Sequence, residues 1–166
     1  MPHSFIPQEP SLEDCWRGII LLGRNVASYK FALAKTLLEL KPQSGELVKL
    51  SELAPVFARQ ITEHLKLADK QGTSQSSKFL DACRDYNSER ISHDKLTDLT
   101  VRHGFANVID AFHTVGQGEV KKRFYVDERS ENDGIRITEE FSELIDRGQS
   151  LNLPVETEAR WRLVET

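Results

Sequence analysis

The sequence predicts a mainly α-helical protein with a small β-hairpin, in which a helical N-terminal half precedes a winged-helix-like C-terminal half. Three observations lead to this fold class. Apolar residues recur every three or four positions along most of the chain, as on one face of a helix. Short β-prone segments are concentrated between residues 122 and 137. The second half has the order helix, tight turn, helix, hairpin, helix, which is typical of a winged helix-turn-helix.

In the first half, the apolar series that begins at Leu12 and ends at Leu40 predicts one helix or a pair of helices, with Gly23 as a kink or break. Residues 41–45 contain Pro and Gly and form a stop signal, after which residues 47–50 are extended. Two further helices are expected at about residues 51–67, where Pro55 is tolerated in the first turn, and at residues 77–86.

In the second half, Ser92 and Thr138 are expected to cap helices, because a side-chain oxygen there accepts a hydrogen bond from the first turn. The elements expected here are helices from Ser92 to about Val101, at 107–115, from Thr138 to about Gly148 and from Pro154 onward, with strands at 122–127 and 135–137 joined by a polar turn at 128–134.

The chain of 166 residues divides, in this interpretation, into three parts. Residues 1–87 form a helical subdomain, residues 88–153 a winged-helix-like subdomain, and residues 154–166 the start of a further helix. That last helix reaches Thr166 without a stop signal, so we expect the chain to be an N-terminal fragment of a longer protein. Residues 1–87 contain 11 basic and 10 acidic residues and the remainder contains 11 and 16, so a protein that coats nucleic acid is disfavoured.

Composition excludes several classes of protein. The longest apolar run, at residues 18–23, is too short to cross a bilayer, and the N-terminus does not resemble a signal peptide. Cys15 and Cys83 belong to no paired motif and are expected to be reduced core thiols of a cytoplasmic protein. We recognise no nucleophile elbow or metalloprotease motif and no Cys/His cluster, so we expect no catalytic residues, metal ligands or cofactor in this chain.

Cationic and amide side chains near a helix break and in a loop before a helix are candidate phosphate contacts, because guanidinium, ammonium and backbone N–H groups bind anions there. The expected nucleic-acid-binding residues are Arg24, Asn25, Lys30, Lys70 and Gln71, with Lys121, Lys122 and Arg123 as a secondary patch. The winged-helix-like unit is a weaker candidate for reading DNA. Its expected second helix, at 107–115, contains no Lys or Arg, and its turn at 128–134 is mostly acidic.

Several segments of the chain resemble a group of bacterial HNH endonucleases. The first is the segment from Cys15 to Lys35, and the others are residues 64–66, 69–73, 79–83, 104–113 and 159–165. In that group, the resemblance implies, a ββα-metal nuclease module follows this region, and there a His activates water while a divalent metal stabilises the cleaved phosphodiester. This chain lacks the Asp-His pair and the following Asn and His of that module.

The resemblance therefore implies a domain that positions nucleic acid, or another subunit, for a nuclease module outside this chain, with a role in phage defence or in a mobile element. The chain alone is not expected to be catalytic. Two alternatives stay open. One is a stand-alone winged-helix regulator that binds DNA, and the other is a protein-interaction module that does not bind nucleic acid.

Overall fold

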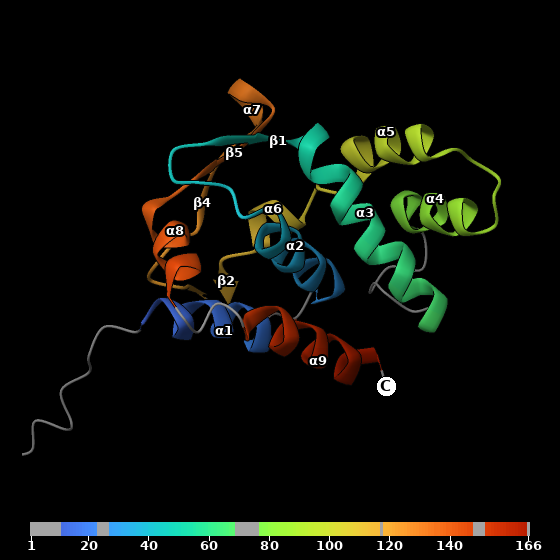
Figure 1. Cartoon of the computed structure of the whole chain (residues 1–166). Coiled ribbons are helices and arrows are strands. Elements are labelled where there is room, and N and C mark those ends of the chain that lie inside the picture. The colour runs from blue at the N-terminus through green and yellow to red at the C-terminus, as the bar shows by residue number, and fades with distance from the viewer. Residues whose placement is uncertain (1–10, 23–26, 69–76, 117, 148–151, 166) are drawn as a thin grey trace, which may run out of the picture.

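The computed structural model describes residues 11–22, 27–68, 77–116, 118–147 and 152–165, and these residues are mainly helical with a small antiparallel β component (Figure 1). The helices are α1 (Leu12–Leu22), α2 (Ala27–Leu40), α3 (Leu50–Leu67), α4 (Lys78–Asn87), α5 (His93–His103), α6 (Val108–Ala111), α7 (Arg129–Asn132), α8 (Glu139–Asp146) and α9 (Leu153–Glu165). The strands are β1 (Leu47–Lys49), β2 (Thr114–Val115), β3 (Gly118–Glu119), β4 (Tyr125–Glu128) and β5 (Gly134–Ile137).

The strands form two antiparallel sheets, one of three strands in the order β1-β5-β4 and one of the two strands β2 and β3. In the larger sheet, Val48 of β1 lies opposite Ile135 of β5, and Val126 of β4 lies opposite Arg136. The central strand therefore pairs with a strand from each half of the sequence. The sheet lies at one end of the molecule, above α8 in Figure 1, while α1 and α9 lie side by side at the other.

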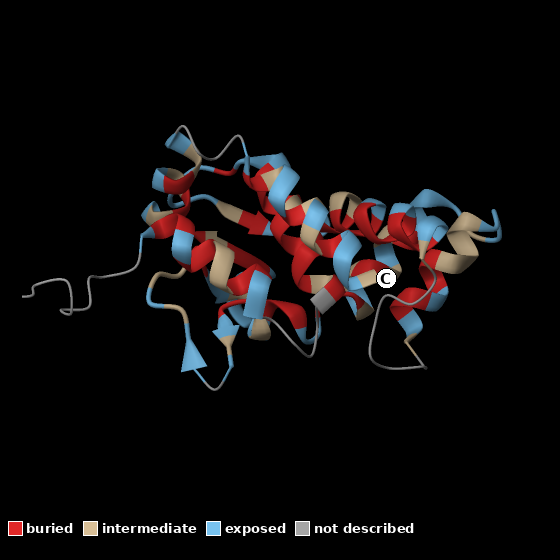
Figure 2. Ribbon diagram, turned by 90° about the horizontal axis from the view of Figure 1, so that it is seen from below, coloured by how far each residue is buried: buried red, intermediate tan, exposed pale blue. Residues whose placement is uncertain are grey.

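Aromatic side chains from distant parts of the sequence fill the interior around α1. Trp16 is buried, and its ring lies 5.7 Å from that of Phe112, 5.1 Å from that of Phe124 and 6.0 Å from that of Phe141. Such rings bury large apolar areas and gain further from edge-to-face contacts. The buried residues in Figure 2 run through both halves of the chain as one hydrophobic core.

This core joins the three expected parts of the chain. β1 lies within residues 1–87 but pairs with β5, which lies within residues 88–153. The buried Trp161 of α9, from residues 154–166, stacks on Phe31 of α2 at a ring distance of 5.9 Å. The expected boundaries at 87/88 and 153/154 therefore cross continuous packing in the described part of the chain.

Most of the elements expected from the sequence are present, including the caps. The hydroxyls of the expected caps Ser92 and Thr138 each accept a hydrogen bond from the first turn of the helix that follows, and so does that of Ser77, which was not predicted as a cap. The prediction of one helix over 107–115 is wrong. Only α6 is helical there, and residues 114–115 form β2. The turn expected at 128–134 contains the short helix α7.

Two expectations drawn from composition, the core thiols and the lack of a membrane span, can be compared with the structure. Cys15 and Cys83 are both buried and free, as expected for core thiols. Within the described ranges, no helix combines the length and the apolar character that crossing a membrane requires.

The contact between β1 and β5 predicts the effect of one substitution. A Cβ atom at Gly134 would lie 2.3 Å from the carbonyl oxygen of Val48, so Gly134→Ala forces the two backbones apart. We expect this variant to lower the free energy of unfolding by about 2 kcal/mol or more, measured by urea denaturation. The matched control is Gly118→Ala, because nothing lies within 4 Å of a Cβ there. Equal stability of the two variants would contradict this account of the sheet.

Candidate functional site

Two expected cationic segments, residues 23–26 and 69–76, lie outside the described residues, but the residues that follow them are in contact at the first turn of α2. Tyr29 Oη lies 3.1 Å from Ser77 Oγ, and Ser77 follows directly after residues 69–76. Lys30 Nζ donates a hydrogen bond of 2.5 Å to the carbonyl oxygen of Thr114 in β2. The turn of α2 that follows residues 23–26 is therefore in contact both with the start of α4 and with β2.

The expected site residues have different outcomes. Arg24, Asn25, Lys70 and Gln71 lie outside the described residues. Lys121 is exposed, and Lys122 and Arg123 are half-buried in the segment between β3 and β4. Arg123 also donates a 2.7 Å hydrogen bond to Glu119.

The expectation that Lys30 contacts phosphate at the surface is corrected by the structure. Its side chain is buried, with 3% of its surface exposed, so its ammonium does not face solvent. Burial lowers the pKa of Lys30 to about 8, because the charged form is poorly solvated in the interior. Sequence reasoning missed this burial because the helical spacing alone does not show that Lys30 reaches the backbone of β2.

Two of the expected cations, Lys30 and Arg123, act on the same buried histidine, His113. The backbone N–H of Phe124 donates to His113 Nε2 over 2.9 Å, so this nitrogen carries no proton. Burial of the ring lowers the pKa of His113 to about 3, and the positive charges of Arg123 and Lys30 contribute to the shift. The His113 imidazole is therefore neutral at physiological pH, chiefly because it is buried.

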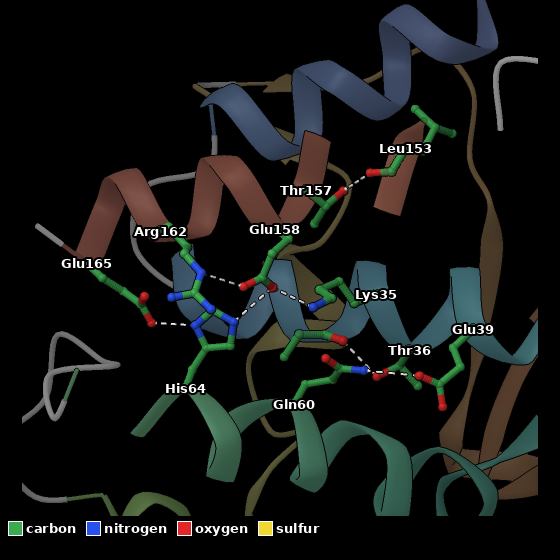
Figure 3. Close-up of polar contacts among 11 residues, drawn as sticks. Lys35, Thr36, Glu39, Gln60, His64, Leu153, Thr157, Glu158, Arg162 and Glu165 are labelled. Carbon is green, nitrogen blue, oxygen red and sulfur yellow. Dashed lines mark hydrogen bonds and ion pairs between the residues drawn. The ribbon is translucent and has the colours of Figure 1, made fainter. Parts of the chain in front are cut away.

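A second polar cluster, which sequence reasoning did not find, holds α9 against α2 and α3 (Figure 3). The His64 ring is buried and stacks on that of Trp161, with ring centres 3.4 Å apart. Its Nε2 lies 2.9 Å from Glu158 Oε1, and its Nδ1 lies 2.5 Å from Glu165 Oε2. Both ring nitrogens of His64 therefore lie within hydrogen-bond distance of a carboxylate of α9.

Glu158 is the centre of this cluster. It accepts hydrogen bonds from Lys35 Nζ at 2.5 Å and from Arg162 Nε at 2.9 Å, in addition to its contact with His64. Burial by itself raises the pKa of Glu158. The hydrogen bonds and charges of Lys35 and His64 outweigh this effect and lower the pKa to about 2. Glu158 is therefore ionised throughout the physiological range and binds three elements together.

The two clusters differ in what they can do. The side chain of His64 is only 4% exposed, while Glu158 and Arg162 of the same cluster are 28% and 54% exposed, and the cluster positions α9. The cations between β3 and β4 are the better candidate for binding an anion, because Lys121 is exposed. No family model, curated protein or solved structure matches the chain. Among the described residues, no group of three or more His, Cys, Asp or Glu side chains is arranged to hold a metal ion.

The buried ammonium predicts that Lys30→Met stabilises the protein at neutral pH. Because the folded-state pKa is about 8 and the ordinary value is 10.5, the unfolded chain holds this proton more tightly, and native stability rises as pH increases from about 8 to 10.5. We expect Lys30→Met to gain about 1–2 kcal/mol at pH 7 and less at pH 10, measured by urea denaturation. The exposed Lys95→Met is the control. A loss of stability at pH 7 would show that the ammonium is favourable in place.

The His64 cluster predicts a pH dependence of the same sign in the acidic range. The folded-state pKa of Glu158 is below the unfolded value, so its contribution is present above about pH 4.5 and is lost as pH falls toward 2. We expect Glu158→Gln to destabilise the protein by about 1–3 kcal/mol at pH 7, and by much less at pH 3. The exposed acid Glu143→Gln serves as control and should change little at either pH. An equal loss at both pH values would argue against a role for the charge.

Proposed function

We propose that this chain is the nucleic-acid-positioning domain of a cytoplasmic HNH-type endonuclease whose catalytic ββα-metal module lies outside it. The observation that carries the proposal is the group of three cations between β3 and β4, Lys121, Lys122 and Arg123, of which Lys121 is exposed. The other candidate contacts, Arg24, Asn25, Lys70 and Gln71, lie outside the described residues. The resemblance of several segments to HNH endonucleases supports the same assignment.

Such a site fits the phosphate backbone better than the bases. Lys and Arg side chains neutralise phosphates and release counterions, which gives affinity that depends on salt and little on sequence. In the proposal, the exposed Lys121 and the cations that follow it in the sequence hold the strand. The metal-dependent cleavage belongs to the separate module, where a divalent ion stabilises the cleaved phosphodiester.

We further propose a winged-helix-like arrangement for the sheet and the helices next to it. The sheet order β1-β5-β4, with α2 before β1 and α3 after it, supports this description. It makes a stand-alone DNA-binding regulator the second candidate. Two observations disfavour that candidate. The helix α6 spans only four residues, and Arg129 of α7 is already bonded to Asp127 and Asp110.

A titration of labelled single- and double-stranded nucleic acid at several salt concentrations tests the proposal. We expect the logarithm of the affinity to fall linearly with the logarithm of salt concentration. The double variant Lys121→Ala/Lys122→Ala should weaken binding to every sequence about equally and reduce the salt slope by about 1–2. Arg24→Ala and Lys70→Ala should each reduce the slope by about 1.

The matched control is Lys95→Ala, an exposed lysine on α5, for which the affinity should not change. Equal weakening by the control would show that binding depends on overall charge and not on this site. Absence of binding to either kind of strand would favour a protein-interaction module, and dependence on a palindromic sequence would favour the winged-helix regulator.

A further inference from the structure

An apolar groove of about 330 Å³ runs between α1 and α9. Its walls include Trp16, Ile20 and Leu21 of α1 and Ala159 and Leu163 of α9. Leu21 is 51% exposed and Leu163 is 64% exposed, so these large side chains leave apolar surface in contact with water. The apolar surface continues beyond the groove to Leu22 and Val155, which makes it longer than a small ligand requires.

The outward face of α9 carries a regular apolar stripe. Val155, Ala159 and Leu163 are spaced by four residues and therefore lie above one another on one side of the helix. The opposite side carries the buried Thr157 and Trp161 and packs on the core. α9 thus has two apolar sides, and the inward one is occupied by its own chain. The outward stripe has a small residue, Ala159, at its centre, where another helix can approach closely.

The charges beside the stripe complement those of a second α9 that runs in the opposite direction. Along one edge lie Glu156 and then Arg160. When two such helices cross in antiparallel fashion at Ala159, the acidic end of this edge meets the basic end of the same edge of the other helix. Glu156 of each copy then faces Arg160 of the other.

Arg160 is available for this contact. It is partly exposed, and in the described part of the chain it has neither a hydrogen bond nor an ion pair. Glu156 is 43% exposed and accepts from Arg17 at 2.8 Å and 3.0 Å, with capacity for another donor. A single pair of this kind is weak at a surface, but two-fold symmetry repeats it and places it beside a buried apolar contact.

We propose that the α1–α9 groove is a homodimer interface, in which the outward stripes of two antiparallel α9 helices pack together and Leu163 of each copy covers the groove of the other. The interface is isologous, since each copy presents the same stripe and the same charges. This proposal does not depend on nucleic-acid binding, because none of the cations around the first turn of α2 takes part in it.

Sedimentation equilibrium of the whole chain, without nucleic acid and over a wide range of concentration, tests the dimer. We expect a reversible monomer–dimer equilibrium. Leu163→Asp should raise the dissociation constant about a hundredfold or more, because the charge is buried in both copies. Leu67→Asp is the matched control, since Leu67 is also an exposed leucine but lies at the end of α3, outside the groove.

A charge exchange tests the pairing itself. Arg160→Glu alone should raise the dissociation constant about tenfold, because two acids then face each other twice. Glu156→Arg alone should also weaken the dimer. An equimolar mixture of the two variants should restore it, because both cross-copy pairs become opposite in sign again. Circular dichroism of each variant checks that the helices are intact.

Three results would overturn the proposal. A chain that is monomeric at every concentration would leave the groove to a helix of a different protein. A dimer whose dissociation constant is the same in Leu163→Asp and in Leu67→Asp would place the interface elsewhere. A dimer that is sensitive to Leu163→Asp but not restored by the mixture would overturn the antiparallel pairing.

Discussion

The antiparallel pairing of β1 with β5 holds the two halves of the chain together, and it depends on the absence of a side chain at Gly134. The backbone of β1 passes so close to this residue that the Val48 carbonyl oxygen occupies the space a Cβ would need. Hydrogen bonds at both ends of the pairing, from Gly45 N to Ile137 O and from Leu50 N to Asp133 O, extend the contact. α3 starts directly after β1 and α8 follows soon after β5, so this pairing sets where both helices begin.

Charge is distributed unevenly between the surface and the interior. Many surface cations are neutralised by neighbouring acids, as Arg136 is by Glu128 and Arg129 by Asp127. Lys30, by contrast, is buried with a backbone carbonyl as its hydrogen-bond acceptor, close enough to His113 to help lower its pKa. In the proposed contact with phosphates, local cations at the surface, and not the net charge of the chain, provide the attraction.

α9 links the interior to the proposed interface. Its inward side is held by the stacked pair of His64 and Trp161 and by the hydrogen bonds to Glu158. Because these contacts determine how the helix is rotated about its axis, they also determine that Val155, Ala159 and Leu163 face outward. The polar cluster around His64 can therefore matter for the proposed interface through the surface that it positions.

Local chemistry was sufficient to predict the helices and many of their ends, because a cap such as Ser92 or Thr138 bonds to residues within its own first turn. The same reasoning placed β1 and β5 but did not show that they pair, since nothing in either segment specifies a partner so distant in the chain. It also assigned Lys30 to the surface. Its burial by β2, like the meeting of His64 with Glu158 and Glu165, depends on contacts between elements far apart in sequence. Such contacts form when the core packs, and the helical periodicity of the sequence does not predict them.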